Sequence, residues 1–148
     1  MAAGLGSRYG GLKQIDPIGP NGEILLEFAI QDMISFGGEK IICIVSEWIR
    51  GDFETIIVEK YKNQVQIELI VQSIEKAPID YIQSRTKPWG TAHAVWCARE
   101  NIEWPFIVIN ADDFYGREAL KQAYSFLLEH EGNNHCVVTY PLENTLSQ

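Results

Sequence analysis

The stretch EILLEFAIQDMISFGGEKIICIVS, Glu23 to Ser46, joins two different hydrophobic patterns directly. From Glu23 to Phe36, apolar residues recur at positions 25, 26, 29, 30, 33 and 34. This is the spacing of an amphipathic helix, and two glycines at 37 and 38 are typical of a helix end. Lys40 to Ser46 is a β-branched run of the kind that forms a strand buried on both faces. The stretch therefore predicts a helix followed by a strand.

The same alternation of helix and strand patterns continues along the chain. A helix is expected over Gly51–Tyr61, Gly90–Asn101 and Arg117–His130, and a strand over Val65–Gln72, Phe106–Ala111 and His135–Tyr140, with an irregular segment over Ser73–Trp89. Alternating strands and helices with short connections predict a mostly parallel sheet with helices on both faces. The expected fold is a three-layer α/β/α sandwich.

Length and composition favour one globular domain over residues 1–148. The chain is 46% hydrophobic and 22% charged, which is enough apolar material for one core. A net charge of -8 argues against nucleic acid as a main partner, because such a surface must neutralise phosphates. Neither a membrane-spanning stretch nor an export signal is visible. Cys43, Cys97 and Cys136 form no CxxC pair and have apolar neighbours, so we expect buried, reduced thiols and a cytoplasmic protein.

Glycines are concentrated near the start of the chain, where Ala3 to Lys13 reads AGLGSRYGGLK. Closely spaced glycines let backbone amides approach an anion, and Arg8 and Lys13 add positive charge, a combination that suits a polyphosphate. A dinucleotide fingerprint from Gly4 fails because Tyr9 stands where it needs glycine. A Walker A loop fails because Leu12 stands where it needs lysine.

The segment MAAGLGSRYGGLKQ resembles the signature of the sugar-phosphate nucleotidyltransferases, in which a strand runs into Ala-Ala-Gly-x-Gly-x-Arg and a lysine follows. This resemblance implies a Rossmann-like, GT-A-like fold. It also implies that the backbone of Ala3 and Gly4 contacts the nucleotide base and that Gly6 belongs to the same nucleotide-binding loop. By the same resemblance, Arg8 binds the leaving phosphates and Lys13 the phosphates at the reaction centre. The alternative is a glycine-rich surface turn with chance basic residues.

Two adjacent acids, Asp112 and Asp113, follow the expected strand that ends at Ala111. Open α/β sheets bind ligands at the carboxyl ends of their strands, and Mg²⁺ prefers carboxylate and phosphate oxygens. The family carries a metal-binding Asp at the matching strand end, so the resemblance implies that Asp112 binds Mg²⁺. The alternative is that one of these acids caps the following helix.

A loop at Lys87 to Ala94, KPWGTAHA, opens the third expected helix. By resemblance, Gly90 and Thr91 touch the base and Gln72, at the end of the preceding strand, reads its edge. His93 is not needed as a general base, because in nucleotidyl transfer to a sugar phosphate the attacking phosphate oxygen is already anionic. We therefore expect His93 to serve in packing.

Together these motifs predict an enzyme that transfers a nucleotidyl group from a nucleoside triphosphate to a sugar 1-phosphate, or a similar phosphorylated alcohol, and releases pyrophosphate. The resemblance covers only the first part of the family's catalytic domain. A nucleotide-binding module without turnover is therefore a second hypothesis, and a regulatory domain that binds no nucleotide is a third.

The chain opens on Met-Ala-Ala-Gly, whereas phosphate-binding glycine loops normally follow a strand. Either Met1 to Ala3 is the stub of that strand or the rest of it has been lost, so the domain looks truncated at both ends. An incomplete central strand leaves an open sheet edge. We expect either residues upstream of Met1 or self-association through that edge.

Overall fold

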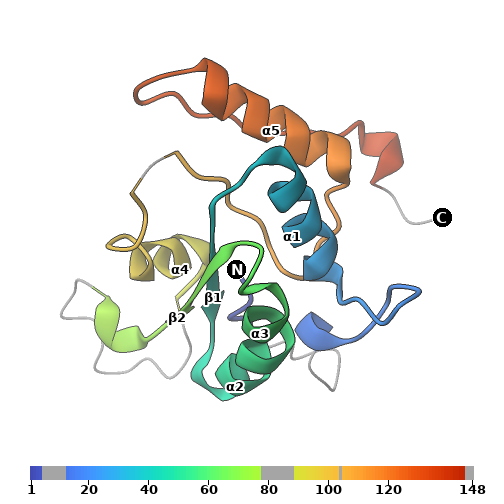
Figure 1. Ribbon diagram of the computed structural model, residues 1–148. Helices are drawn as coiled ribbons and strands as arrows, with labels where there is room; N and C mark the ends of the chain where they lie inside the picture. The colour runs from blue at the N-terminus through green and yellow to red at the C-terminus, as the bar shows by residue number, and fades with distance from the viewer. Residues whose placement is uncertain (5–12, 78–88, 104, 146–148) are drawn as a thin grey trace.

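The computed structural model describes residues 1–4, 13–77, 89–103 and 105–145, and only the backbone of Lys13. Helices and two strands alternate along these ranges (Figure 1). None of the helices in these ranges is long and apolar enough to cross a membrane. The main elements are α1 (Leu25–Phe36), β1 (Lys40–Val45), α2 (Arg50–Phe53), α3 (Glu59–Tyr61), β2 (Gln66–Val71), α4 (Thr91–Cys97) and α5 (Arg117–Glu129). Short 3-10 turns lie at Lys13–Ile15, Glu47–Ile49, Ile74–Lys76 and Leu142–Asn144, and a π-helical turn at Glu54–Val58 joins α2 to α3.

Helix α1 begins and ends where its sequence predicts. The backbone N–H of Ile24 donates to the Glu27 carboxylate at 2.9 Å, which satisfies one of the free amides of the first turn. At the other end Gly37 adopts a left-handed conformation with φ of 92°, and its N–H donates to the carbonyl of Ile34. Glycine adopts this conformation without steric cost, so it ends the helix.

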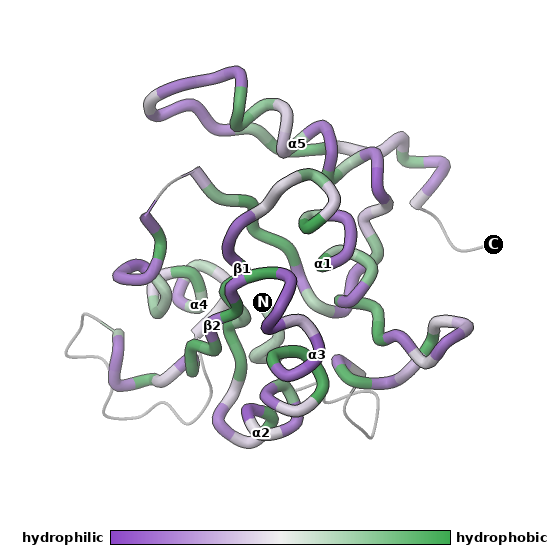
Figure 2. The backbone as a smooth tube through the Cα atoms, viewed as in Figure 1, coloured by the Kyte–Doolittle hydropathy of each residue, from purple (hydrophilic) through white to green (hydrophobic). Residues whose placement is uncertain are grey.

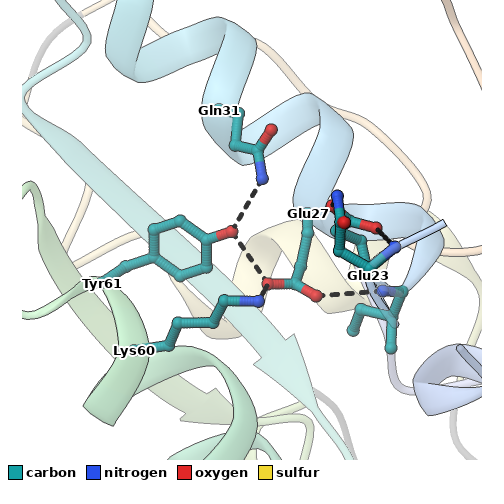
Figure 3. Close-up of polar contacts among 7 residues, drawn as sticks. Glu23, Glu27, Gln31, Lys60 and Tyr61 are labelled. Carbon is teal, nitrogen blue, oxygen red and sulfur yellow. Dashed lines mark hydrogen bonds and ion pairs between the residues drawn. The ribbon is translucent and has the colours of Figure 1, made fainter. Parts of the chain in front are cut away.

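The Glu27 carboxylate also ties α1 to α3 (Figure 3). Its side chain is 1% exposed, accepts a hydrogen bond from the Tyr61 hydroxyl at 2.8 Å and pairs with the Lys60 ammonium. Gln31 donates to the same tyrosine oxygen at 3.2 Å. A buried carboxylate is stable only when its oxygens are paired. This network therefore fixes the start of α1, which follows the glycine loop, against the α2–α3 helical run.

Strands β1 and β2 form a small parallel sheet that is covered on both faces. Their register pairs Lys40 with Gln66 at one end and Val45 with Val71 at the other. Successive side chains of a strand point to opposite faces. Cys43 packs in the cluster built mainly from α1, α2 and α3, whereas Ile44 packs with α4. Figure 1 likewise shows α4 on one side of β1 and α1 on the other.

Met1 and Ala2 bond to the edge of β1 that faces away from β2 and to the segment that ends at Ala111. The N–H of Ala2 donates to the carbonyl of Ile44 at 2.7 Å. The Met1 amine donates to the carbonyl of Ile109 at 2.7 Å, and the Met1 carbonyl accepts from Ala111 N–H at 2.9 Å. In a parallel pair of strands, one residue bonds to the two residues that flank the position opposite it. Met1 bonds in this way to Ile109 and Ala111. These residues therefore lie as a strand stub between β1 and the segment that ends at Ala111.

The expected strand over Phe106–Ala111 is not formed. The segment contacts the sheet through the bonds to Met1, while Phe106 and Val108 remain 50% and 45% exposed. An open cavity of about 560 Å³ lies between residues 105–109 and β1 and is lined in part by apolar side chains of α1, α4 and α5. A strand needs a neighbouring edge for its hydrogen bonds, and here the cavity lies where that neighbour would be.

Backbone groups of β1 face this cavity. The carbonyl of Val45 bonds Gln72 in the direction of β2, whereas that of Ile44 bonds Ala2 on the opposite edge. Because backbone groups alternate between the two edges of a strand, those of Ile42 face the cavity. The cavity is therefore bordered by backbone groups of β1 that point away from β2, next to Met1.

The expected strand over His135–Tyr140 is not formed either. Val137 is 85% exposed, and this segment contacts the body through the Tyr140 hydroxyl, which donates to the carbonyl of Tyr115 at 2.8 Å. Its apolar side chains lack a sheet face to cover, so β propensity alone does not produce a strand. The described residues thus form a mixed helix and strand structure with a small parallel sheet.

Two of the three cysteines are buried as expected and one is not. Cys43 and Cys97 are buried free thiols, whereas Cys136 is exposed, which contradicts the expectation for that residue. Burial raises the pKa of the Cys43 thiol to about 11. Cys43 is therefore a packing residue with a protonated thiol at neutral pH. Cys136 is exposed because the segment around it has no sheet to pack on.

Candidate functional site

The parallel segments of the sheet end along one edge, and polar or glycine residues follow each of them. Gly4 follows the Met1 stub, Ser46 follows β1, Gln72 follows β2, and Asp112 follows the segment that bonds to Met1. In open α/β sheets this carboxyl edge is where ligands bind. The structure therefore brings four chemically suitable positions to the place where the sequence predicts a nucleotide.

The first residues of the glycine loop are anchored in the body. Ala3 is buried and Gly4 is exposed, and the carbonyl of Gly4 accepts from Nε2 of Gln14 at 2.8 Å. Gln14 is itself buried, at 6% exposure. This bond closes the loop across its two described ends. Gly6, Arg8 and the side chain of Lys13 lie outside the described residues, so their phosphate-binding roles stay predictions.

Gln72 lies against the start of α4, as the resemblance implies. Its Nε2 donates to the carbonyl of Trp89 at 2.7 Å and lies 3.4 Å from that of Gly90. Gly90 and Thr91 are exposed beside it. The structure therefore brings Gln72 to Gly90 and its neighbour Thr91, three of the five residues that are expected to contact the base.

His93 completes a polar chain behind Gln72 that the sequence analysis did not foresee. Its Nδ1 lies 3.1 Å from Nε2 of Gln72, and its Nε2 lies 3.6 Å from Sγ of Cys97. Sγ of Cys97 in turn lies 3.9 Å from the carbonyl of Ser73. Burial lowers the pKa of His93 below its ordinary value. The spacing of four residues between His93 and Cys97 on a helix is the one signal of this contact in the sequence.

The acidic turn after Ala111 does not cap helix α5. Asp113 accepts from Nδ2 of Asn110 at 2.8 Å and lies 3.5 Å from the Tyr115 hydroxyl, so it braces the turn itself. The N-cap of α5 is Gly116, and its first turn has no side-chain cap. Neither acid therefore stands at the N-cap position of α5.

Asp112 is exposed at this turn, close to the strand stub. Burial lowers the pKa of the Met1 amine, and the negative charge of Asp112 acts on that amine in the opposite direction. The described residues contain no group of three or more His, Cys, Asp or Glu side chains that would cage a metal. Mg²⁺ is commonly held by one or two carboxylates together with substrate phosphates. A single exposed Asp at the ligand edge therefore fits Mg²⁺ that arrives with a triphosphate.

Ser46 is a polar residue at this edge that the sequence analysis passed over. It is 7% exposed, and its hydroxyl has no hydrogen-bond partner among the described residues. A buried hydroxyl without a partner costs free energy and calls for an explanation. It lies at the end of β1, between the strand stub and Gln72. The signal in the sequence was a hydroxyl residue directly after the apolar run.

Comparisons with known proteins agree with this geometry. The family model described as nucleotidyl transferase matches residues 1–146. A curated relative, the UTP--glucose-1-phosphate uridylyltransferase of Bacillus subtilis (strain 168), is 31% identical over 132 residues. That match covers 79% of this chain and 44% of the relative, so the chain spans less than half of the relative's length. The chain belongs to the nucleotidyl transferase family, and its resemblance to sugar-phosphate nucleotidyltransferases is confirmed.

Proposed function

We propose that this chain binds a uridine-type nucleoside triphosphate at the carboxyl edge of its sheet and transfers the nucleotidyl group to a sugar 1-phosphate. The observation that carries the proposal is the meeting of Gly4, Gln72 and Asp112 at one sheet edge in a chain that the family model matches from residue 1 to 146. The name of the relative, which specifies UTP and glucose 1-phosphate, supports the choice of substrates.

The hydrogen bonds of Gln72 support a base of the uracil type. Its Nε2 carries two hydrogens, and the nearest acceptors are the Trp89 carbonyl at 2.7 Å and Nδ1 of His93 at 3.1 Å. The amide oxygen Oε1 has no hydrogen bond to the described residues and is left to accept one from a ligand. Uracil offers a ring N–H at N3, whereas cytosine has an acceptor there. Gln72 therefore favours UTP over CTP.

The reaction needs charge neutralisation more than proton transfer. The attacking phosphate oxygen is already anionic, so the protein must place the two substrates in line and stabilise charge on the leaving pyrophosphate. Arg8 and Lys13 supply positive charge for this role. Mg²⁺ held by Asp112 would neutralise phosphate charge when it is bound. His93 takes no part in proton transfer in this scheme, because the reaction requires no base.

We also propose that the domain is a three-layer α/β/α sandwich. The helices that cover both faces of β1 and β2 support this, as does the parallel pattern at Met1, which continues the sheet. Two packed faces are the condition under which a parallel sheet is stable.

Titration calorimetry with UTP and Mg²⁺, beside an assay of pyrophosphate release in the presence of glucose 1-phosphate, tests the proposed function. Saturable binding together with release supports the enzyme. Binding without release supports the second hypothesis, a nucleotide-binding module. The absence of any triphosphate binding would contradict both.

A further inference from the structure

The polar chain behind Gln72 runs between two backbone carbonyls, and this determines the direction of every hydrogen bond in it. This series of hydrogen bonds runs from the Trp89 carbonyl through the Gln72 amide, the His93 ring and the Cys97 thiol to the carbonyl of Ser73. A carbonyl oxygen only accepts hydrogen bonds. The group facing each carbonyl must therefore be a donor.

At the Ser73 end of this series of hydrogen bonds, the Cys97 thiol has a single hydrogen. Cys97 gives this hydrogen to the Ser73 carbonyl, so its sulfur can only accept from the His93 ring. Nε2 of His93 then carries the ring proton. In a neutral ring Nδ1 is bare, and it accepts from the Gln72 amide 3.1 Å away.

At the other end, the Gln72 amide is fixed by its bond to Trp89. The atom 2.7 Å from the Trp89 carbonyl must be the amide nitrogen, because two oxygens at that distance would repel each other. The second amide hydrogen goes to His93 Nδ1. Both hydrogens are then used inside the protein, and Oε1 alone is left for a ligand.

We propose that His93 is a positioning residue that sets base selectivity by holding the Gln72 amide with its oxygen available to the nucleotide. This inference rests on the proposed function, in which Gln72 reads the base. Were the His93 acceptor lost, the amide would be less restrained against rotation. The rotated amide would offer N–H groups, which suit the N3 acceptor of cytosine.

A neutral His93 ring is required for this arrangement. If both ring nitrogens carried protons, an N–H on Nδ1 would face the N–H groups of Gln72. Burial, which lowers the pKa of His93, favours the neutral ring at neutral pH. The His93 side chain is only partly buried, and its packing against the buried Cys97 holds it on the inner side of α4.

Matched variants of the whole chain test this role through selectivity. UTP and CTP are titrated into the wild type, His93→Leu, His93→Asn and the control His130→Leu, whose ring lies by the Phe126 carbonyl at the end of α5. In His93→Leu we expect the ratio of UTP to CTP affinity to fall about fivefold, the effect of one hydrogen bond. His93→Asn, which keeps an acceptor near the position of Nδ1, restores most of the ratio, and His130→Leu leaves it unchanged.

Two outcomes overturn the inference in distinguishable ways. If the wild type prefers UTP and His93→Leu keeps the same ratio, the positioning role is wrong and the proposed function stands. If the wild type binds neither nucleotide, both are wrong. Nitrogen-resolved NMR of the His93 ring at neutral pH gives an independent result without nucleotide. A proton on Nε2 with bare Nδ1 is expected, and a proton on Nδ1 contradicts the inference.

Discussion

Nε2 of Gln72 lies 3.1 Å from Nδ1 of His93, across a separation of 21 residues in the sequence. Gln72 follows β2 and His93 lies in the first turn of α4, so this contact joins the sheet to the loop at the start of that helix. The candidate base site is therefore held together by side-chain contacts between the end of β2 and the start of α4. This relationship gives the first prediction.

Replacing Gln72 by Leu should weaken UTP binding about five- to tenfold, because it removes the acceptor for the ring N–H and costs roughly one hydrogen bond. Discrimination between UTP and CTP should largely disappear. Calorimetric titration measures both quantities. Gln66→Leu, at the exposed start of β2, is the matched control and should bind like the wild type. Equal selectivity in Gln72→Leu and the wild type would show that this residue does not read the base.

The buried Glu27 network should contribute strongly to stability. Glu27→Gln removes the charge that pairs with Lys60 and leaves a buried amide with fewer suitable partners, so we expect a loss of about 1–3 kcal/mol in the free energy of unfolding. Tyr61→Phe removes one hydrogen bond of the same network and should cost about 1 kcal/mol. Urea denaturation measures both changes.

Glu59→Gln provides the control for this network. Glu59 pairs with Lys62 on the exposed surface, where an ion pair contributes little to stability. Its substitution should change the free energy of unfolding by less than about 0.5 kcal/mol. A loss in Glu27→Gln no larger than in Glu59→Gln would mean that the buried carboxylate does not hold α1 to α3.

The two neighbouring acids of the turn should behave differently. Asp112→Asn should weaken the binding of UTP in the presence of Mg²⁺ and leave Mg²⁺-free binding almost unchanged, because it removes a metal ligand. Asp113→Asn should retain Mg²⁺-dependent binding, since Asp113 is engaged with Asn110 inside the turn. Titrations with and without Mg²⁺ distinguish them. If Mg²⁺-dependent binding falls more in Asp113→Asn than in Asp112→Asn, the metal ligand is Asp113 and not Asp112.

The cavity beside β1 should accept one more strand. A short β-branched extension joined to Met1 should raise the thermal unfolding midpoint, because it buries apolar side chains and pairs with the backbone groups of Ile42 that face the cavity. The same extension with proline inside it lacks a backbone donor and should stabilise less. Equal midpoints for the two extended chains would show that no strand forms there. Light scattering on the unextended chain tests self-association through the same edge.

Helices were predictable because their signals are local. The apolar spacing from Leu25 to Phe36 and the glycine at 37 predict α1 to within two residues, and α5 was predicted from its apolar spacing alone (Figure 2). The strands at Lys40–Val45 and Gln66–Val71 were also predicted, since each provides the edge that the other needs.

The two failed strands show the limit of such patterns. The segments at 106–111 and 135–140 have apolar, β-branched sequences, but neither has a neighbouring strand along its length. A strand forms only where a neighbouring segment pairs with its backbone, and the hydropathy pattern of one segment does not show whether such a neighbour exists. The exposed Cys136 has the same cause, because its predicted burial depended on a strand that did not form.

The candidate site divides in the same way. Motif resemblance named Gln72, Gly90 and Asp112, which lie at strand ends or at the start of a helix. The hydrogen-bond series from Gln72 through His93 to Cys97 was not predicted, because only its helical step from His93 to Cys97 has a local signal, whereas Gln72 and His93 lie 21 residues apart. The pairing of Glu27 with Lys60, which are far apart in the sequence, was missed for the same reason.

Pyrophosphate release from UTP and glucose 1-phosphate in the presence of Mg²⁺ tests the proposed nucleotidyl transfer most directly. We expect release that requires both substrates and is abolished by Lys13→Ala, because the reaction centre loses a positive charge. Failure of the wild type to release pyrophosphate while it binds UTP, or undiminished release by Lys13→Ala, would contradict the proposed mechanism.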